Sequence, residues 1–416
     1  MPRTFVAFAM SLILAAAASA EFRAGVAVRV VTPDPPLPIV GGIGAPRPVE
    51  EVRSDLTVRA LVFEQGDNRV ALVGSDFLGF PHVLCDRVRE QVPGIPPENV
   101  IISATHTHSA PDVYGFSEML GDGVSTDLEY LDFVVSEMAA AINEAVDTLQ
   151  PASVRIAEGE PEGKIAYNYY AEQLFDPRAH VIQAVGANGE PMATLLNYAI
   201  HPEVLGPGNG ILSPDLCGPL YDRIEARGGG VGIFIPAAIG GMITADNRGE
   251  DGRSMRTWDE CVRIGELLAD KTLRIIEDAP LQEEPSLWVG ARDVYFPIDN
   301  PMIRAVLLNS PLEWEIPEDW ILPAQVNVVN LGNAQMLTIP GEAMPNIGYY
   351  LRRNMHGEYN LLLGLANDAF GYIIAKVDWN SFPRYDYITR TSLGEMTGEI
   401  FMEESLAFVD EAPRPE

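Results

Sequence analysis

The stretch Val100–Ser109 reads VIISATHTHS, and in it an apolar run passes directly into a polar run that carries two histidines. The apolar part, Val100–Thr105, predicts a fully buried β-strand, because strands covered on both faces lack the usual polar alternation. Asn68–Asp76 (NRVALVGSD) has the same apolar centre, and a short helix is expected over 83–92 between the two. Strand, helix and strand in succession are typical of an α/β fold, in which functional side chains follow the strand ends.

The same interleaving of strands and helices continues along the chain. We expect further strands over 23–31, 55–64, 181–184, 193–200, 231–235, 326–331, 336–339 and 361–366, and a helix over 258–276. Another helix is expected to begin at a cap on Ser125 or Thr126 and to reach Leu149, with one apolar stripe made of Leu128, Leu131, Val135, Met138 and Ile142. This pattern predicts an α/β fold with a mixed sheet flanked by helices.

One stretch could contain a domain boundary, a weak joint in the chain: the acidic residues 278–285 (DAPLQEEP). Buried-strand patterns resume after this stretch. We therefore expect a single domain over residues 21–416, preceded by a targeting segment over residues 1–20.

That segment, MPRTFVAFAMSLILAAAASA, has the features of a secretory signal peptide: Arg3, an apolar run, and the small residues Ala18-Ser19-Ala20 as a cleavage signal. The alternative is an uncleaved anchor, but the apolar run is short for a membrane span. No later apolar run reaches eighteen residues, so no further span is expected. The mature protein would start near Glu21 and would be secreted or periplasmic.

Charge and cysteine content restrict the partners of the chain. Its 416 residues include 28 Lys+Arg against 59 Asp+Glu, a formal net charge of −31, and such a surface is repelled by the phosphates of nucleic acid. The three cysteines, Cys85, Cys217 and Cys261, lie far apart, so we expect buried thiols or one optional disulfide. These features are compatible with a small-molecule or lipid-like substrate, and the sequence leaves the oligomeric state open.

The candidate site begins with His106 and His108 in THTHS. On an extended backbone a His-x-His pair points both imidazoles to one face, because side chains alternate along a strand. Two such imidazoles can share a metal, or divide into a ligand and an acid/base group. The alternative interpretation is a pair of hydrogen-bonded loop histidines.

Other strand ends supply further candidates. His201 follows the apolar strand NYAI, and Glu342 follows a Pro-Gly turn after another strand. Either alone is more typical of a structural residue, but with the first two histidines they form a nitrogen and oxygen set suited to Zn²⁺. Tyr372 follows the buried strand 361–366 through a short loop, and its sequence context alone does not distinguish a ligand from a packed ring.

A glycine-rich segment, Gly240–Asn247 (GGMITADN), follows the expected strand 231–235. The adjacent Gly240 and Gly241 allow close backbone approach to a ligand, and their N–H groups could form an oxyanion site. The alternative is a tight turn. The segment matches neither a P-loop, a GxGxxG motif nor a GxSxG elbow.

The order of these motifs resembles the neutral ceramidase family, the neutral/alkaline non-lysosomal ceramidases. THTHS, a strand-end histidine, a glycine-rich segment, PGE and GLAN followed by a tyrosine occur in that order between about Gly25 and Leu406. The resemblance implies one zinc ion held by His106, His201, Glu342 and Tyr372. It places His108 beside the metal as a hydrogen-bond partner of the substrate.

Two departures accompany the resemblance. Family members that cut ceramide carry a nucleophile-like serine in the glycine-rich segment, whereas here Thr244 is the nearest hydroxyl. Those enzymes also carry a C-terminal immunoglobulin-like domain, so the chain is expected to correspond to their N-terminal catalytic domain only.

The resemblance therefore implies a secreted zinc-dependent hydrolase of amide (N-acyl, ceramide-like) or ester bonds, with a role in sphingolipid metabolism. Metal-activated water would be the nucleophile, His108 the acid/base group, and Gly240 and Gly241 oxyanion donors. Thr244 is the alternative nucleophile. The alternative functions are an inactive secreted binding protein of the same fold and an esterase or amidase for a substrate that is not a sphingolipid.

Overall fold

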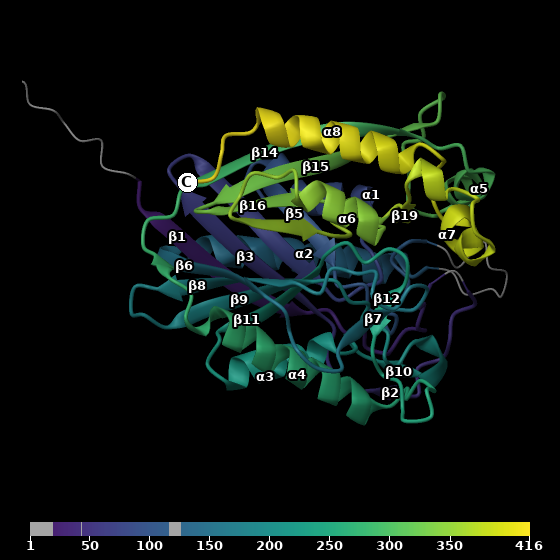
Figure 1. Cartoon of the computed structure of the whole chain (residues 1–416), viewed down its shortest axis with the longest axis horizontal. Coiled ribbons are helices and arrows are strands. Elements are labelled where there is room, and N and C mark those ends of the chain that lie inside the picture. Colours follow the sequence, from purple (N-terminus) through teal and green to yellow (C-terminus); the bar gives the residue numbers. More distant parts are fainter. Residues whose placement is uncertain (1–19, 43, 116–125) are drawn as a thin grey trace, which may run out of the picture.

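Two stacked β-sheets form the centre of the computed structural model, which describes residues 20–42, 44–115 and 126–416 (Figure 1). The larger sheet has the strand order β11-β9-β8-β6-β1-β3-β4-β5, with β13 paired to β6. Only β4/β5 and β9/β11 pair in parallel, so this sheet is mixed. Its strands are β1 (Phe22–Val30), β3 (Thr57–Gln65), β4 (Asn68–Ser75), β5 (Val100–Ala104), β6 (Gln150–Gly159), β8 (Ala179–Gly186), β9 (Pro191–Tyr198), β11 (Val231–Pro236) and β13 (Leu281–Gln282).

The second sheet runs in the order β14 (Leu287–Pro297), β15 (Ile321–Leu331), β16 (Ala334–Thr338) and β18 (Tyr359–Leu363). One face of each sheet contributes to a shared core, in which Leu61, Leu72 and Ile101 of the larger sheet join Met336 and Leu361 of the smaller one. The expected weak joint at 278–285 contains β13 and leads directly to β14. It is therefore the crossing from one sheet to the other.

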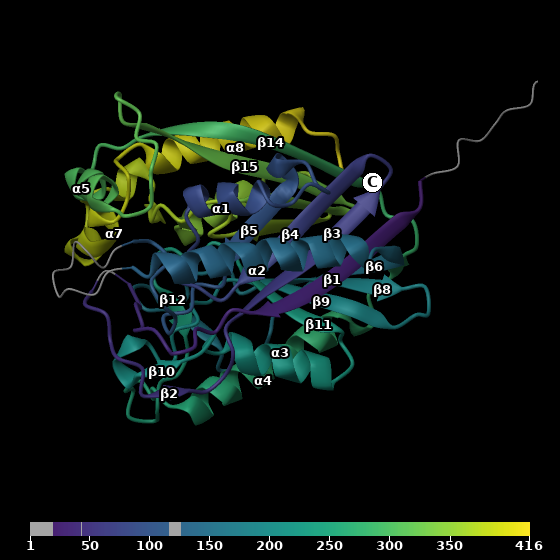
Figure 2. The same ribbon diagram turned by 180° about the vertical axis from the view of Figure 1, so that it is seen from behind.

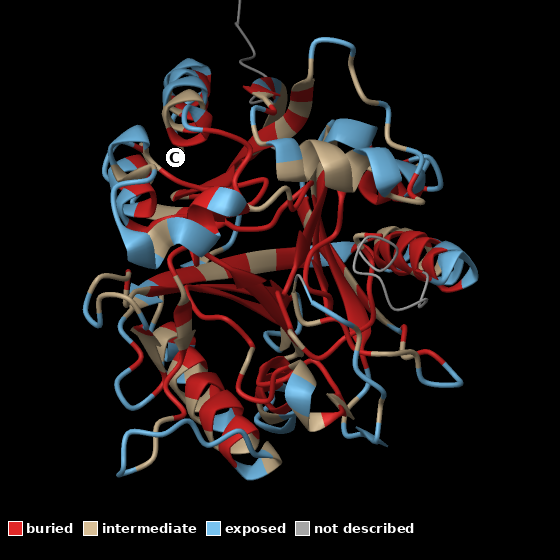
Figure 3. Ribbon diagram, turned by 90° about the vertical axis from the view of Figure 1, so that its right-hand side faces the viewer, coloured by how far each residue is buried: buried red, intermediate tan, exposed pale blue. Residues whose placement is uncertain are grey.

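Helices cover the two outer faces, which gives four layers in the order helix, sheet, sheet, helix (Figures 1, 2 and 3). The outer face of the larger sheet packs against α1 (His82–Arg89), α2 (Leu128–Asp147), α3 (Cys217–Ala226) and α4 (Trp258–Glu277). The smaller sheet packs against α6 (Pro345–Arg352) and α8 (Thr397–Glu411), while α5 (Pro301–Asn309) and α7 (Asp386–Arg390) lie at one end.

Short elements connect these layers. They are β2 (Glu51–Val52), β7 (Ala166–Asn168), β10 (Ile211–Leu212), β12 (Ile243–Ala245), β17 (Glu342–Ala343), β19 (Tyr372–Ile373), and the 3-10 turns η1 (Pro97–Asn99), η2 (Pro207–Asn209), η3 (Lys376–Asp378) and η4 (Pro383–Tyr385).

The predicted mixed sheet with flanking helices is confirmed, and the structure adds the second sheet. The predicted beginning of α2 is wrong by one or two residues. The Asp127 side chain accepts from the Tyr130 N–H at 2.9 Å and caps the helix, because the Thr126 hydroxyl donates to Asp112 instead; Ser125 lies outside the described residues. Leu128 does not belong to the buried stripe, since it is 47% exposed.

The predictions about the N-terminus and the cysteines have different outcomes. Residues 1–19 of the expected signal peptide lie outside the described part of the chain. In the described part, none of the helices combines the length and the apolar character of a membrane span. Cys85, Cys217 and Cys261 are buried free thiols, so the optional disulfide does not form.

Candidate metal and active site

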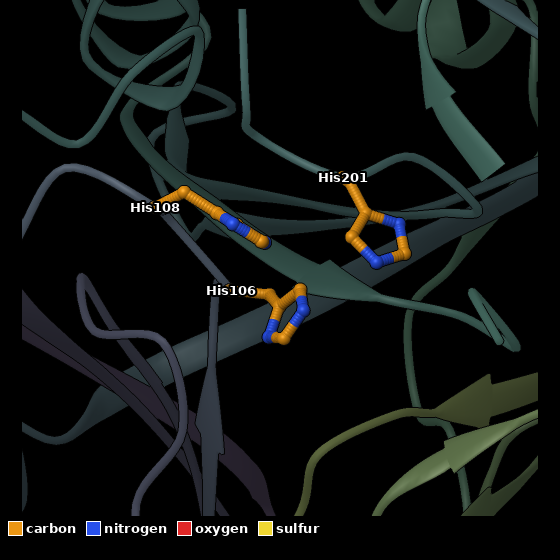
Figure 4. Close-up of side chains that lie close together, drawn as sticks. All are labelled: His106, His108 and His201. Carbon is orange, nitrogen blue, oxygen red and sulfur yellow. The ribbon is translucent and has the colours of Figure 1, made fainter. Parts of the chain in front are cut away.

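Three loops that follow strands bring the candidate residues together. His106 and His108 follow β5, His201 follows β9, and Glu342 follows β16 at the beginning of β17. Backbone hydrogen bonds fix each loop: the N–H groups of His106, His201 and Glu342 donate to Phe77, Ile243 and Gly371 at 2.9 Å each. The three rings meet in one place (Figure 4), and we call His106, His108, His201 and Glu342 the histidine cluster.

The predicted extended backbone of the His-x-His pair is wrong. His106 has φ = +69°, in the left-handed region that non-glycine residues seldom adopt. The rings of His106 and His108 nevertheless lie close together, edge to face, with their centroids 4.9 Å apart. The centroid of the His201 ring lies 4.7 Å from that of His106. Such a conformation persists only where the surrounding contacts hold it, and it is typical of functional sites.

Backbone carbonyls fix the orientation of all three imidazoles. The Nδ1 atoms of His106, His108 and His201 lie within hydrogen-bonding distance of the carbonyl oxygens of Leu78, Gly41 and Ile243. Because a carbonyl can only accept, each Nδ1 carries the proton, which leaves the Nε2 lone pair open. The Nε2 atoms of His108 and His201 are buried and have no hydrogen-bond partner. An anchored Nδ1 and an open Nε2 are typical of metal-ligating histidines.

Glu342 is the carboxylate of the cluster, and it is buried. Its Oε1 lies 3.7 Å from His106 Nε2, and its Oε2 lies 3.3 Å from His201 Nε2. Burial opposes ionisation of this group, but His106 and His201 outweigh that effect and hold the pKa of Glu342 at about 2. Burial lowers the pKa of His106 to about 3, whereas Glu342 and Glu203 raise the pKa of His201 against the effect of its burial. Glu342 is thus an anionic carboxylate, and His106 stays neutral.

The donor set fits a metal ion such as Zn²⁺. The candidate ligand atoms of His106, His108 and His201 lie within 4.8 Å of one another. The fit includes His108, which the family resemblance places beside the metal. Imidazole nitrogens with a carboxylate are a ligand set that zinc commonly takes in hydrolases.

Tyr372 is held next to this cluster by backbone pairing. Strands β17 and β19 are parallel and place Glu342 opposite Tyr372. The Tyr372 ring is buried, and its hydroxyl lies 3.5 Å from Met242 Sδ. Burial, and the nearby carboxylate of Glu342, raise the pKa of this phenol well above its ordinary value. The structure therefore places Tyr372 in contact range of the cluster as a neutral phenol.

An apolar pocket leads to the histidine cluster. Its polar end contains His106, His108, Glu342 and Tyr372. Most of the other lining residues are apolar, and Asp368 and Thr391 also line the pocket; the apolar ones include Leu78, Pro81, Ile303, Val306, Leu307, Trp314, Leu322, Phe370 and Leu393. A pocket of this kind, with a few polar groups at one end, suits a ligand that has a long apolar part.

The glycine pair and Thr244 do not line this pocket. The Gly240 N–H donates to the Ala343 carbonyl at 2.9 Å, so in this structure it is not open to an oxyanion. A Cβ on Gly240 would lie 2.6 Å from the Glu342 carbonyl oxygen. Gly240 therefore permits close packing against the turn that carries Glu342. Gly241, at φ = +78°, forms the tight turn of the glycine-rich segment.

Glu203 is a residue of the site that sequence reasoning missed. Its carboxylate lies 3.9 Å from His108 Nδ1 and accepts from the Thr244 hydroxyl. Its N–H donates to the His201 carbonyl at 2.9 Å. The signal was present in the sequence, because Glu203 comes two residues after His201 in His-Pro-Glu.

Comparison with known proteins supports the fold. No family model matches the chain. The neutral ceramidase of Pseudomonas aeruginosa is 26% identical over 176 residues, which span 38% of this chain and only 26% of the relative's own length. A crystal structure of neutral ceramidase from Pseudomonas aeruginosa superposes with a TM-score of 0.75 at 18% identity, over 95% of this chain and 76% of that chain. A ceramidase complexed with C2 gives a TM-score of 0.74 over the same shares, also at 18% identity. The inferred relationship to neutral ceramidases is confirmed, and the chain has their fold.

Proposed function

We propose that this chain is a zinc-dependent hydrolase of amide bonds in N-acyl, ceramide-like compounds or of related ester bonds. The observation that carries the proposal is the convergence of three imidazoles and one buried carboxylate at the end of an apolar pocket. The relationship to proteins named neutral ceramidase supports the same class of reaction.

In this proposal His106, His201 and Glu342 hold the zinc ion, with Tyr372 as the fourth ligand. When bound, zinc supplies a Lewis acid for the scissile carbonyl and lowers the pKa of a water molecule towards ~7. The grouping of three imidazoles favours one alternative, in which His108 is the fourth ligand instead. The zinc content of His108→Ala and Tyr372→Phe decides between the two sets.

The remaining groups position the substrate and move its protons. The Nδ1–H of His108 donates to the Gly41 carbonyl at 3.0 Å, so its buried Nε2 is open to accept a proton and later return it to the leaving group. Glu203 lies behind the same ring and favours this orientation. The apolar walls of the pocket hold the acyl chain and exclude water, which strengthens the electrostatic interactions at the polar end.

The test is a hydrolysis screen of the purified, zinc-loaded protein with a fluorogenic N-acyl sphingosine and a p-nitrophenyl ester. Wild type should turn over at least one substrate and contain one zinc per chain, and His106→Ala should lose both properties while keeping the circular dichroism of wild type. Zinc binding without turnover of either compound would favour a binding protein with this fold. A folded wild type that binds no zinc would overturn the proposal.

The proposal includes export of the chain, on the basis of its first twenty residues. N-terminal sequencing of the protein from its native source should begin near Glu21. An intact Met1 would contradict cleavage, but it would leave the zinc chemistry untouched.

A further inference from the structure

Helix α5 is mostly apolar and only partly covered: Ile303 and Leu307 pack against the core of the smaller sheet, whereas Leu308 is 64% exposed. Its sequence, PMIRAVLLN, has six apolar side chains in addition to Pro301, yet none of its residues is buried. Its one charged side chain, Arg304, turns inward, donating to the Ile298 carbonyl at 2.5 Å and stacking on Trp320. A helix that is apolar around most of its circumference is ordinarily covered.

Further apolar side chains are exposed on the segment that runs from η3 through α7 to the beginning of α8. We call Leu308, Val377, Phe382, Tyr387 and Met396 the apolar rim; they are exposed by 64%, 78%, 50%, 41% and 40%. Helices α5 and α7 lie together at one end of the molecule (Figure 1), and η3 and η4 directly precede α7 in the chain. The Phe382 ring contacts Tyr385, whose ring contacts Tyr170, so an aromatic row extends the rim.

The apolar rim is continuous with the pocket of the histidine cluster. Ile303, Val306 and Leu307 of α5 line the pocket, and Leu308 follows them on the outer side of the same helix. Tyr387 lines the pocket and is also 41% exposed, so the pocket meets the surface at the rim. A substrate that enters there crosses exposed apolar side chains before it reaches His106 and Glu342.

We propose that the apolar rim docks on a lipid surface, such as a bilayer or a micelle, from which the pocket takes its substrate. This inference rests on the proposed function, which gives the site a substrate with a long apolar part. Tyr387 combines an apolar ring with a polar hydroxyl, as side chains at membrane interfaces do. A second copy of the chain is a poorer occupant, because it would close the pocket and because two chains of charge −31 repel each other.

The test measures binding to phosphatidylcholine vesicles by flotation, using the full chain. These vesicles carry no net charge, so binding should survive about 0.5 M NaCl, at which electrostatic attraction is screened. The double variant Leu308→Asn/Val377→Asn should bind at least ~10-fold more weakly, because apolar area drives the contact. Leu281→Asn/Val30→Asn is the matched control: it makes the same two substitutions at positions that are 41% and 50% exposed outside the rim, and it should bind like wild type.

Each outcome separates docking from chemistry. Both double variants should hydrolyse a soluble p-nitrophenyl ester at the wild-type rate, since neither pair lines the pocket. His106→Ala should still float with the vesicles, so docking can stand even if the proposed hydrolysis fails. Equal vesicle binding by wild type and the rim variant, or no binding by wild type, would overturn the proposal. A wild-type dimer that the rim variant converts to monomer, with no vesicle binding, would overturn it in favour of self-association.

Discussion

Two buried polar clusters in this molecule have similar residues but differ in how their charges are paired. In the histidine cluster one carboxylate, Glu342, faces imidazoles, and the Nε2 atoms of His108 and His201 have no hydrogen-bond partner. In the second, which we call the Arg352 cluster, Arg178 and Arg352 pair directly with Asp176, and Arg178 and the neutral ring of His180 lie against Glu158. Arg352 Nη1 lies 2.5 Å from Asp176 Oδ2, and Arg178 Nη2 lies 2.6 Å from the same oxygen.

The comparison indicates that some buried polar groups serve ligand binding, whereas others stabilise the fold. Buried charges that neutralise each other hold the fold, and their loss should appear in stability. Neutral nitrogens with open lone pairs gain little from folding, so a bound ligand is their natural partner. The two clusters should therefore respond in opposite ways to matched substitutions.

The largest effect is expected in the histidine cluster. Glu342→Gln replaces the anionic ligand with a neutral amide and should lower kcat/KM by roughly 10³-fold or more, with weaker zinc binding. Steady-state kinetics and zinc titration measure both. Full activity in a zinc-loaded Glu342→Gln protein would remove this carboxylate from the ligand set.

Removal of a charged side chain from the Arg352 cluster should lower the stability of the protein. Arg352→Met removes the buried partner of Asp176, which retains Arg178, and should lower the free energy of unfolding by about 1.5–3 kcal/mol, the usual cost of a lost hydrogen bond to a charged group. Folded Arg352→Met should keep its zinc and its kcat. The exposed neighbour provides the control, because Arg353→Met should change stability by only about 0.5 kcal/mol. Urea unfolding compares the three proteins, and equal stabilities would contradict the structural role of the cluster.

His108→Ala tests whether His108 acts on the substrate or binds the metal. If His108 acts on substrate, its loss should lower kcat/KM by about 10²–10³-fold, the usual cost of a missing electrostatic or acid/base group. Zinc should remain bound at wild-type stoichiometry. Loss of zinc in this variant would instead make His108 a ligand, in agreement with the grouping of the three imidazoles.

Acid should destabilise the Arg352 cluster through His180. Burial, with Arg352 nearby, lowers the pKa of His180 from 6.5 to about 4. The unfolded chain binds this proton first, so the contribution of the neutral ring is complete above pH 6.5 and is lost as the pH falls towards 4. The slope is at most about 1.4 kcal/mol per pH unit. Urea unfolding between pH 7 and 5 should show this slope in wild type and a shallower one in His180→Gln; identical slopes would exclude His180 as its source.

Sequence patterns predicted the fold well where burial is continuous. The apolar runs at Asn68–Asp76 and Val100–Thr105 became β4 and β5, because a strand covered on both faces needs no polar alternation. Strand β14 was missed because only part of it is buried, and no apolar run marks it. The stacking of two sheets depends on contacts between residues far apart in the chain, such as Leu61 and Met336, which no local pattern contains.

The site was predictable in its residue types but not in its geometry. Strand ends identified His106, His201 and Glu342 as candidates, and the structure brings them together. The left-handed backbone of His106 is set by the surrounding loops, so the alternation rule could not predict it. The Gly240 N–H was expected to face a ligand, but it bonds to Ala343, a partner that only the tertiary fold supplies.

The smallest effect is expected at Thr244, and it tests whether this hydroxyl takes part in the chemistry. Thr244 lies on β12 and donates to Glu203, outside the lining of the pocket. Thr244→Ala removes one hydrogen bond to a carboxylate that retains His108 on its other side, so kcat/KM should fall by no more than about 10-fold, the equivalent of ~1.4 kcal/mol. Thr244→Ser keeps the hydroxyl and serves as the control. If Thr244→Ala abolishes hydrolysis with zinc still bound while Thr244→Ser retains it, the hydroxyl is the nucleophile. The geometry instead gives Thr244 the weaker task of orienting Glu203 behind His108, and loss of that contact should shift the rate without stopping the reaction.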